Sequence, residues 1–423
     1  MIIIREPQLQ VKNGKARLMA RISIPETAYD TWVSRIGSME RYAGYEKMYQ
    51  RGQGEFELWY ETEAEYAHGM CCERNDAFVL AMIYFAMVTG EDIKSLAPVS
   101  NELAHNLNTY LIPLHCNERT GYRAVRVIAE TECDPLDSAG ENGTGISCGV
   151  DSLDTVLRYY EKDMDPEHRL TCLCLFNTGA FYNMPDMKKC IAGTMTVREW
   201  DEKAEEQFEA ECMRGKRVAD ELGLSFVPVN SNISRLYQGA FLESHAYRNC
   251  SAVLALEKLF GHYYYASAGE PEKIFMGLEN AASDNVWLFS TESVRFYIGS
   301  FERTRIDKLE FLSGYELTKK YLHVCSNESS YNCGKCGKCF RTMLILELIG
   351  KLDQFASAFE STEFYEKKKW KKFVWILDKR PDDQFAADIY AYMKKNNMHI
   401  PAIARIYHYT LPVRRMIKKV IKK

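Results

Sequence analysis

Short runs of alternating apolar and polar residues fill the first third of the chain, the pattern of strands with one buried face. They lie at 9–11, 16–22, 56–60 and 124–128. Between the last two runs, apolar residues recur at helical spacing over 78–84. We find no catalytic motif in this part, and interpret residues 1–140 as an α+β module that shapes a substrate pocket or binds a partner.

The pattern changes after a polar segment at 131–145, which is rich in turn-forming residues and is typical of a linker. Apolar runs at 170–176 and 224–229 predict buried strands. Helical spacing of apolar residues predicts helices at 152–160, 205–222 and 249–260. Strands and helices in alternation predict an α/β domain, over 141–320, with a parallel sheet sandwiched by helices.

The last hundred residues are predicted to be helical, with helices over 340–360 and 366–423, in a C-terminal region at 321–423. The tail from Leu411 is basic and amphipathic. Its apolar residues share one helical face: Val413, Met416, Ile417, Val420 and Ile421. Such a helix suits an anionic membrane surface or an acidic partner, and equally a core-packed final helix with a solvated basic side.

Composition narrows the classes of function. The 423 residues are 46% hydrophobic with a net charge of −4, as in ordinary soluble globular proteins. The acidic balance speaks against a large nucleic-acid substrate, whose phosphates need basic partners. No apolar run approaches the ~20 residues of a membrane span, and no secretory signal is evident, so we expect a cytoplasmic protein. A homodimer is left open.

A phosphate-binding motif precedes the helix predicted at 152–160. It reads Ser147-Cys148-Gly149-Val150-Asp151-Ser152. Free backbone N–H groups and the helix dipole attract anions at a helix N-terminus, and glycine lets phosphate approach the backbone. The two serines add hydroxyl donors, while Asp151 is expected to act through Mg²⁺ or to orient the loop. The simpler alternative is an ordinary helix cap.

This motif resembles the Ser-Gly-Gly-x-Asp-Ser signature of the PP-loop ATP pyrophosphatases. Ser147, Gly149, Asp151 and Ser152 match it, whereas Cys148 stands in place of the first glycine. The resemblance implies an adenine nucleotide alpha-hydrolase-like fold, ATP and Mg²⁺ as cofactors, and cleavage of ATP between its α and β phosphates. The loop, Val150 included, would then hold the pyrophosphate.

Two further segments resemble the same family. Asn177-Thr178-Gly179 follows a predicted strand, where the family binds adenine; a plain strand-to-loop turn is the alternative. Arg248 and Asn249 precede an apolar helix. Arg248 would offset charge developing on the phosphates as a catalytic residue, and Asn249 would belong to the binding site or cap the helix. Charged residues such as Arg303 and Arg305 are candidates for the substrate site or for surface ion pairs.

Four cysteines cluster near the C-terminus with the spacing C-x7-C-x2-C-x2-C: Cys325, Cys333, Cys336 and Cys339. Four thiolates complete a tetrahedral shell around Zn²⁺, so we expect a structural zinc site. An iron–sulfur cluster is the main alternative, and four ordinary buried cysteines the simplest one.

The two motifs together resemble the 7-cyano-7-deazaguanine synthases over residues 146–350. That resemblance implies an ATP-dependent C–N ligase, which activates a small carboxylate such as 7-carboxy-7-deazaguanine as an acyl-adenylate. An amine or ammonia then gives an amide, which the family carries on to a nitrile. Two alternatives stay open: a tRNA-modifying enzyme of the thiolation type, and a nucleotide-binding module without catalysis.

Overall fold

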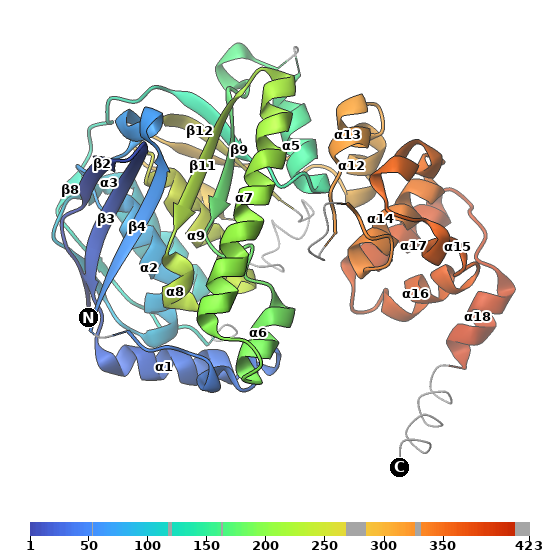
Figure 1. Ribbon diagram of the computed structural model, residues 1–423, viewed down its shortest axis with the longest axis horizontal. Coiled ribbons are helices and arrows are strands. Elements are labelled where there is room, and N and C mark those ends of the chain that lie inside the picture. The colour runs from blue at the N-terminus through green and yellow to red at the C-terminus, as the bar shows by residue number, and fades with distance from the viewer. Residues whose placement is uncertain (53, 117–120, 162–163, 268–284, 326–330, 411–423) are drawn as a thin grey trace. The chain divides into compact units, whose positions relative to one another are not determined.

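The computed structural model divides the chain into two compact units (Figure 1). We call Met1–Ser147 with Thr155–Phe301 the sheet unit, and Cys148–Asp154 with Glu302–Lys423 the cysteine unit. Each unit is described by itself. The structure describes residues 1–52, 54–116, 121–161, 164–267, 285–325 and 331–410. Within these ranges, no helix has both the length and the apolar character needed to cross a membrane.

A sheet of eleven strands forms the centre of the sheet unit. Its order is β13-β12-β9-β10-β11-β4-β3-β1-β5-β7, with β2 beside β3. The strands are β1 Ile2–Ile4, β2 Gln8–Lys12, β3 Lys15–Ser23, β4 Glu55–Glu63, β5 Ile93–Ser95, β7 Val127–Ile128, β9 Glu141–Gly145, β10 Cys172–Asn177, β11 Ser225–Ser231, β12 Phe260–Ala266 and β13 Arg295–Gly299. β6 (Val99–Ser100) and β8 (Thr131–Glu132) pair separately.

The five strands from β13 to β11 pair in parallel, and β4 and β3 continue the sheet antiparallel. The sheet unit is therefore an α/β structure with a mostly parallel central sheet flanked by helices. β10 is buried at all six positions, as expected for a strand covered on both faces. β3 and β4 alternate along much of their length, with one face in the core.

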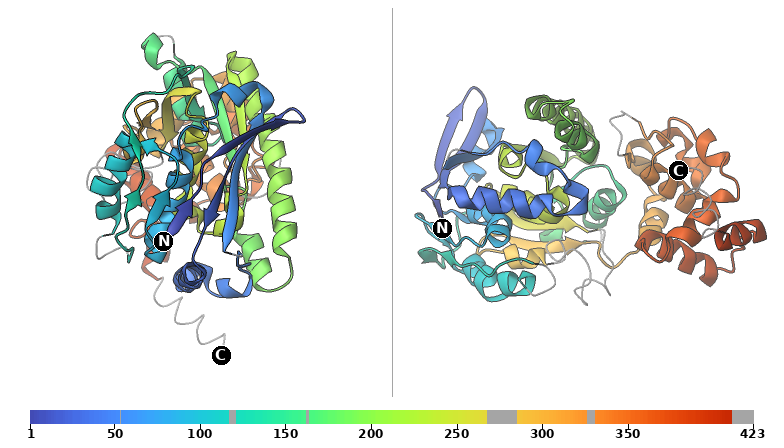
Figure 2. Two further views of the ribbon diagram at one scale, coloured as in Figure 1. Left: turned by 90° about the vertical axis from the view of Figure 1, so that its left-hand side faces the viewer. Right: turned by 90° about the horizontal axis from the view of Figure 1, so that it is seen from below.

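Helices cover both faces of this sheet. In Figures 1 and 2, α7 lies on one face, while α2 and α9 lie on the other. All 14 residues of α2 are buried, because this apolar helix packs between the strands and α9. The helices are α1 Glu26–Gly37, α2 Asp76–Thr89, α3 Asn101–Asn106, α4 Ile112–His115, α5 Val150–Tyr160, α6 Met184–Ile191, α7 Val197–Leu222, α8 Ile233–Tyr237 and α9 Phe241–Leu254.

The segment interpreted as a linker contains β9, a central strand of the sheet. Its glycines weaken strand propensity, yet three neighbouring side chains leave little room for a Cβ. A Cβ at Gly143 would lie 2.7 Å from the Phe260 ring and 3.3 Å from the Cys172 sulfur. A Cβ at Gly145 would lie 3.3 Å from the Tyr263 hydroxyl. The linker prediction fails here because close packing against large residues, and not propensity, selects glycine.

The boundary predicted at residue 140 does not separate two units in the structure. Strands of residues 1–140 extend the same sheet, since β4 pairs with β11 through Glu61–Asn230 and Tyr60–Ser231. Thr62 also donates a hydrogen bond from Oγ1 to the Pro228 carbonyl, 2.6 Å away. The alternation of apolar and polar residues at 55–63 reflects one buried face of β4, which the rest of the sheet unit covers.

The helix predicted at 249–260 begins earlier and ends earlier, since α9 spans Phe241–Leu254. Asn249 consequently lies within the helix and does not cap it. The sequence analysis missed β12 and β13. Beyond the end of α9, Ala255, Leu256, Leu259 and Phe260 are buried, and they carry the apolar character that extended the predicted helix.

The cysteine unit is helical, as predicted for the C-terminal region, but its C-terminal part begins at Glu302 and it also includes Cys148–Asp154. Its helices are α12 Arg305–Leu312, α13 Glu316–Tyr321, α14 Gly337–Leu348, α15 Glu363–Glu366, α16 Lys371–Lys379, α17 Gln384–Lys395 and α18 Ala402–Tyr409. The amphipathic tail from Leu411 lies outside the described residues.

Candidate nucleotide and metal sites

The motif at 147–152 directly follows β9, the strand at which the strand order of the parallel sheet reverses. From β9 the chain proceeds to β10 and β11 on one side, and later to β12 and β13 on the other. Ligands of open α/β sheets bind outside the carboxyl ends of the strands at such a reversal. The motif at 147–152 occupies this connection and begins α5. The motif therefore lies at the kind of position where open α/β sheets bind ligands.

The loop itself is partly open. Ser147 is exposed and Gly149 is half-buried, whereas Cys148 is buried. The Ser152 hydroxyl donates to the Gly149 carbonyl, 3.1 Å away, and the Leu153 amide donates to the same carbonyl at 3.0 Å. Ser152 therefore stabilises the turn, in addition to any contact with a ligand. The Cys148 thiol is packed inside, so it does not close the exposed side of the turn.

Cys148 adopts a left-handed backbone conformation, with a φ of 56°. This region favours glycine, since a Cβ crowds the following carbonyl there. A glycine at residue 148 would adopt this conformation without strain. Its carbonyl accepts a hydrogen bond from the His323 amide at 2.8 Å, which helps to hold this conformation.

Two cations of α12 hold the carboxylate of Asp151. Arg305 and Lys308 lie 3.0 and 3.2 Å from its oxygens. The Lys308 side chain is only 1% exposed, so its charge is poorly screened by water. Of the two roles predicted for Asp151, these contacts match loop orientation. A carboxylate already paired with two cations does not suit a Mg²⁺ ligand, so we assign no step to bound Mg²⁺.

More positive charge lies in the same unit. Arg303 donates to the buried carboxylate of Asp154 at 3.0 Å. Burial, together with the nearby charge of Arg305, lowers the pKa of Arg341 to about 10. The guanidinium of Arg341 stacks on the Phe385 ring at 3.7 Å, and that of Arg305 lies 5.1 Å from the same ring. Two guanidinium groups held together around one aromatic ring favour an anionic ligand.

The predicted residues Asn177 and Gly179 belong to a polar group at the carboxyl ends of β10 and β11. Asn177 donates from Nδ2 to Asn230 at 2.9 Å and to Glu205 at 3.1 Å. Thr178 donates to the Oδ1 of Asn249 at 2.5 Å. The sequence analysis missed Glu205 and Asn230, because a glutamate on a surface helix and an asparagine ending a strand carry no distinct signal.

Arg248 lies beside Gly179, in the core of the sheet unit. Its Nη2 donates to the Ser234 hydroxyl at 2.6 Å and its Nη1 to the Gly239 carbonyl at 3.2 Å. Gly179 has a φ of 132°, and any Cβ there would collide with the guanidinium. Burial lowers the pKa of Arg248 to about 10. Within the described ranges no carboxylate pairs with this cation and its Nε has no hydrogen-bond partner; its guanidinium lies 4.9 Å from the Tyr237 ring and 5.4 Å from the Phe241 ring.

A half-buried histidine, which was not predicted from the sequence, lies one turn away on α9. His245 Nδ1 and the Tyr265 hydroxyl are 2.6 Å apart, and Asn249 donates to the same hydroxyl at 3.3 Å. Burial, reinforced by the charge of Arg248, lowers the pKa of His245 to about 4. His245 is therefore neutral at physiological pH. The structure thus groups Asn177, Gly179, Arg248 and Asn249 in the sheet unit, while Asp151 lies in the cysteine unit.

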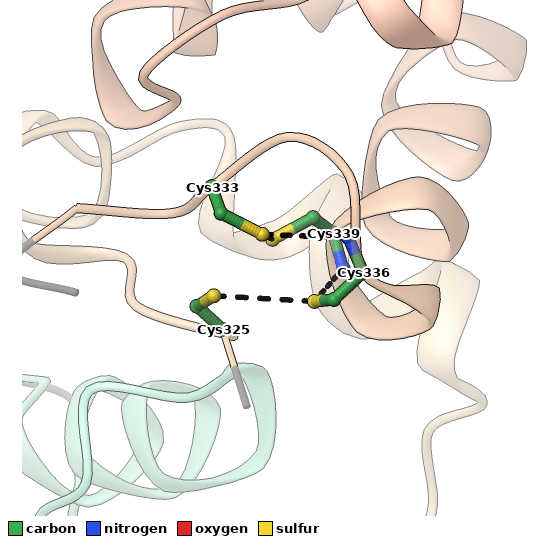
Figure 3. A group of neighbouring side chains, drawn as sticks. All are labelled: Cys325, Cys333, Cys336 and Cys339. Atoms are coloured by element: carbon green, nitrogen blue, oxygen red, sulfur yellow. Dashed lines mark hydrogen bonds between the residues drawn. The ribbon is translucent and has the colours of Figure 1, made fainter. Parts of the chain in front are cut away.

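The four predicted cysteines converge in the cysteine unit, as Figure 3 shows. All four Sγ atoms lie within 4.8 Å of one another. The pairs Cys325–Cys336 and Cys333–Cys339 are 3.9 and 4.0 Å apart. Zinc–sulfur bonds of about 2.3 Å in a tetrahedron require sulfurs about 3.8 Å apart. The cluster can therefore hold one metal ion such as Zn²⁺, and it is too tight to enclose several irons.

Backbone groups around the cysteines complete this arrangement. The amides of Lys335 and Cys336 point at the Cys333 sulfur, both at 3.4 Å, as expected for ligands that carry negative charge. Gly334 has a φ of 67°, and a Cβ there would collide with the Ser361 carbonyl. Burial raises the pKa of Cys339, so without a metal this thiol stays protonated.

Asn332, which the sequence analysis missed, connects the segments that carry the cysteines. Its Oδ1 accepts from the amides of Val324 and Cys325, at 2.7 and 3.1 Å. Its Nδ2 donates to the carbonyls of Leu322 and Ala358, at 2.8 and 2.7 Å. One buried amide thus fixes the first ligand's segment against the knuckle that carries the other three.

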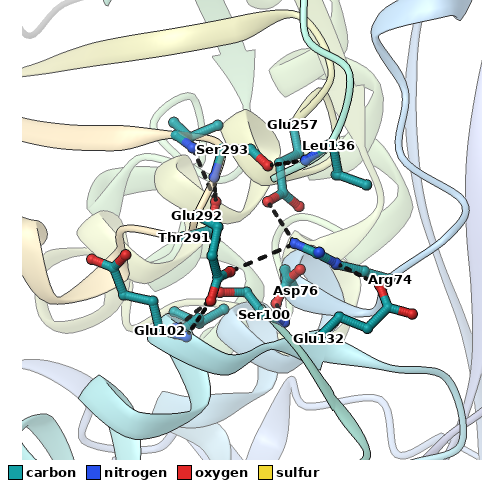
Figure 4. Close-up of polar contacts among 12 residues, drawn as sticks. Arg74, Asp76, Ser100, Glu102, Glu132, Leu136, Glu257, Thr291, Glu292 and Ser293 are labelled. Atoms are coloured by element: carbon teal, nitrogen blue, oxygen red, sulfur yellow. Dashed lines mark hydrogen bonds and ion pairs between the residues drawn. The ribbon is translucent and has the colours of Figure 1, made fainter. Parts of the chain in front are cut away.

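A separate group of buried charges lies in the sheet unit (Figure 4). The Nη1 of Arg74 lies 3.6 Å from Glu292 and 4.0 Å from Glu257. Asp76 accepts from the Ser100 amide at 2.8 Å. Burial, followed by the charge of Glu257, raises the pKa of Asp76 well above its usual range, and burial also raises the pKa of Glu257. We expect the two acids to share a proton at neutral pH.

Comparisons with known proteins give no family: no family model, curated protein or solved structure matches the chain.

Proposed function

We propose that this protein is a PP-loop ATP pyrophosphatase with an adenine nucleotide alpha-hydrolase-like fold, related in chemistry to the 7-cyano-7-deazaguanine synthases. One observation carries the proposal: residues 147–152 connect β9 to α5 at the reversal of the parallel sheet, and Arg305 and Lys308 lie at this loop. At this loop a motif that resembles a phosphate-binding one and a helix N-terminus lie beside one buried and one half-buried cation.

The proposed reaction joins a small carboxylate to an amine at the expense of ATP. A carboxylate oxygen attacks the α-phosphorus, the bond from that phosphorus to the bridging oxygen breaks, and pyrophosphate leaves. An amine or ammonia then attacks the acyl carbon of the acyl-adenylate. AMP leaves, the nitrogen loses a proton, and an amide forms, which a second activation can convert to a nitrile.

The chain's own residues have distinct roles in this proposal. Backbone amides of the loop, with the Ser147 hydroxyl, bind the outer phosphates. Asp151 holds Arg305 and Lys308 in place and so positions their charge. Arg248 binds an anionic group in the sheet unit, supported by its lack of a carboxylate partner there. Zn²⁺ at the four cysteines would stabilise the fold, since four protein ligands leave no open position.

An assay of AMP and pyrophosphate tests the proposal. The protein is incubated with Mg-ATP and a panel of carboxylates that includes 7-carboxy-7-deazaguanine. We expect AMP and pyrophosphate in equal amounts with at least one acid. Asp151→Ala should lower that rate roughly 100-fold or more, because two cations at the loop lose their anchor. Asp220→Ala, which removes an exposed carboxylate paired with Lys216 on α7, should leave the rate unchanged.

The backbone at Cys148 favours one alternative, a nucleotide-binding module without catalysis. A side chain at a left-handed position adds strain to the loop, and catalytic loops of this kind use glycine there. This alternative predicts that ATP binds and that no acid in the panel releases AMP. The thiolation alternative predicts bound iron, which the close spacing of the four sulfurs disfavours.

A further inference from the structure

A cavity of about 230 Å³ opens in the sheet unit, on the side formed jointly by residues 29–52, Phe56, α7 and α8. Its apolar walls include Tyr29, Tyr49 and Phe56. Two guanidinium groups, Arg51 and Arg235, and the carboxylate of Asp201 add charge to the lining. Drug-sized sites typically measure 300–1,000 Å³, so this one suits a smaller ligand of one or two fused rings.

The walls of this cavity are held by hydrogen bonds between distant segments. Gln238 accepts from the Gln50 amide at 2.8 Å and donates to the Gln50 carbonyl at 2.7 Å. The Tyr49 hydroxyl donates to the Leu236 carbonyl at 3.0 Å, which fixes the ring. A preformed wall reduces the ordering cost of binding.

Backbone strain marks the same wall. Gln238, Gly239 and Ala240 have consecutive positive φ values of 43°, 138° and 50°. Two of the three are not glycine, so the surrounding structure must maintain the conformation at a cost. Strain of this kind clusters at binding sites, and here it aims the Gln238 side chain at the Gln50 backbone.

Two arginines favour a negatively charged ligand in this cavity. Arg235 pairs with Asp201 through Nε, at 3.3 Å, and its side chain is 60% exposed. Arg51 pairs with Asp30 through one Nη group, and its side chain is 48% exposed. In the described part of the chain these are their only ion pairs, so each guanidinium retains donors for a ligand. A planar carboxylate matches these donors bidentately.

We propose that this cavity binds a small planar aromatic carboxylate, with its ring against Tyr49 and Phe56 and its carboxylate toward Arg51 and Arg235. The inference goes beyond the proposed ATP chemistry, because binding here requires no nucleotide. Aromatic rings stack or meet edge-to-face, which selects planar ligands over saturated ones of equal size.

Calorimetric titration of the full chain, without ATP, tests this proposal. The probes are benzoate and indole-3-carboxylate, compared with cyclohexanecarboxylate, which lacks the aromatic ring, and benzamide, which lacks the charge. We expect at least one aromatic acid to bind, roughly in the millimolar range or tighter. Each of the two analogues should bind at least about tenfold more weakly.

Arg235→Gln and Arg51→Gln should each weaken binding of the aromatic acid at least about fivefold. Arg198→Gln is the matched control, because Arg198 is an exposed arginine on α7 that does not line the cavity. Absence of binding by both aromatic acids, equal binding of the analogues, or unchanged affinity in both arginine variants would overturn the proposal. Failure of the AMP assay would leave this binding result unaffected.

Discussion

At the scale of single residues, three residues have a backbone conformation or a buried charge that is unfavourable for their type. Cys148 has the backbone of a glycine, Arg248 is a buried cation without an acidic partner in the described part of the chain, and Asp76 is a buried acid next to another acid. Each of these costs free energy in the folded state, which is typical of functional positions.

Strain at Cys148 can be isolated by comparing two substitutions. Cys148→Ala removes the thiol and keeps the Cβ, whereas Cys148→Gly removes both. At most positions glycine is less stable than alanine by roughly 0.5–1 kcal/mol. Here we expect the opposite order by about 1 kcal/mol, because only glycine adopts a φ of 56° without strain. Urea unfolding of the two variants measures this difference, and the ordinary order would contradict the strained loop.

The proton on the Asp76–Glu257 pair predicts a dependence of stability on pH. Since the pKa of Asp76 is raised by burial and by Glu257, the folded state holds a proton that the unfolded chain releases above its usual pKa. The pair's contribution is therefore fully present at acidic pH and is lost as the pH rises toward the folded pKa. Asp76→Asn keeps an acceptor for the Ser100 amide and removes the titration.

When the pH rises from 5 to 8, the free energy of unfolding of Asp76→Asn should fall by about 1–3 kcal/mol less than that of the unsubstituted protein. Guanidinium unfolding at the two pH values measures the difference. Asp220→Asn, an exposed aspartate, serves as the control and should follow the parent. If Asp76→Asn shows the parent's full pH dependence, the two acids do not share a proton.

At the scale of elements, two short segments bring distant parts of the chain together. β9 places the motif at 147–152 where the strand order of the sheet reverses, and its glycines leave room for Phe260 and Tyr263. The cysteine knuckle of 333–339 joins the segment that carries Cys325 through Asn332. Both segments are structured by packing partners far away in the sequence.

Metal binding should hold the cysteine unit together. We expect one zinc per chain by elemental analysis, since four sulfurs lie at the spacing of a single ion. Cys333→Ser should lose the zinc and lower the melting temperature, because the energy of a structural site is folding energy. Cys72→Ser changes an exposed cysteine outside the cluster and should keep the metal. Stoichiometric iron in place of zinc would contradict the assignment.

At the scale of the whole molecule, periodicity predicted the elements that have one buried face or one apolar stripe. These include β3, β4 and α7, while a continuous apolar run predicted the fully buried β10, and the α/β class follows from them. The spacing of the four cysteines predicted a cluster that the structure forms. Such features are local, so they can be inferred from the sequence alone.

The elements that were missed depend on contacts between distant residues. Gly143 of β9 is explained by its close approach to Phe260 and Cys172. The first 140 residues continue the sheet because β4 pairs with β11. The partners of Asp151 lie about 150 positions later, at Arg305 and Lys308. The spacing of apolar residues along the chain carries no information about such contacts between distant residues.

Acid-dependent exchange of labelled pyrophosphate into ATP tests the central claim most directly. Exchange requires that the loop bind pyrophosphate while an acyl-adenylate is held, so it reports the proposed first step without needing the amine. We predict exchange that requires a carboxylate substrate and that is lost in Asp151→Ala. Folded, zinc-loaded protein that binds ATP yet exchanges no pyrophosphate with any carboxylate would contradict the account.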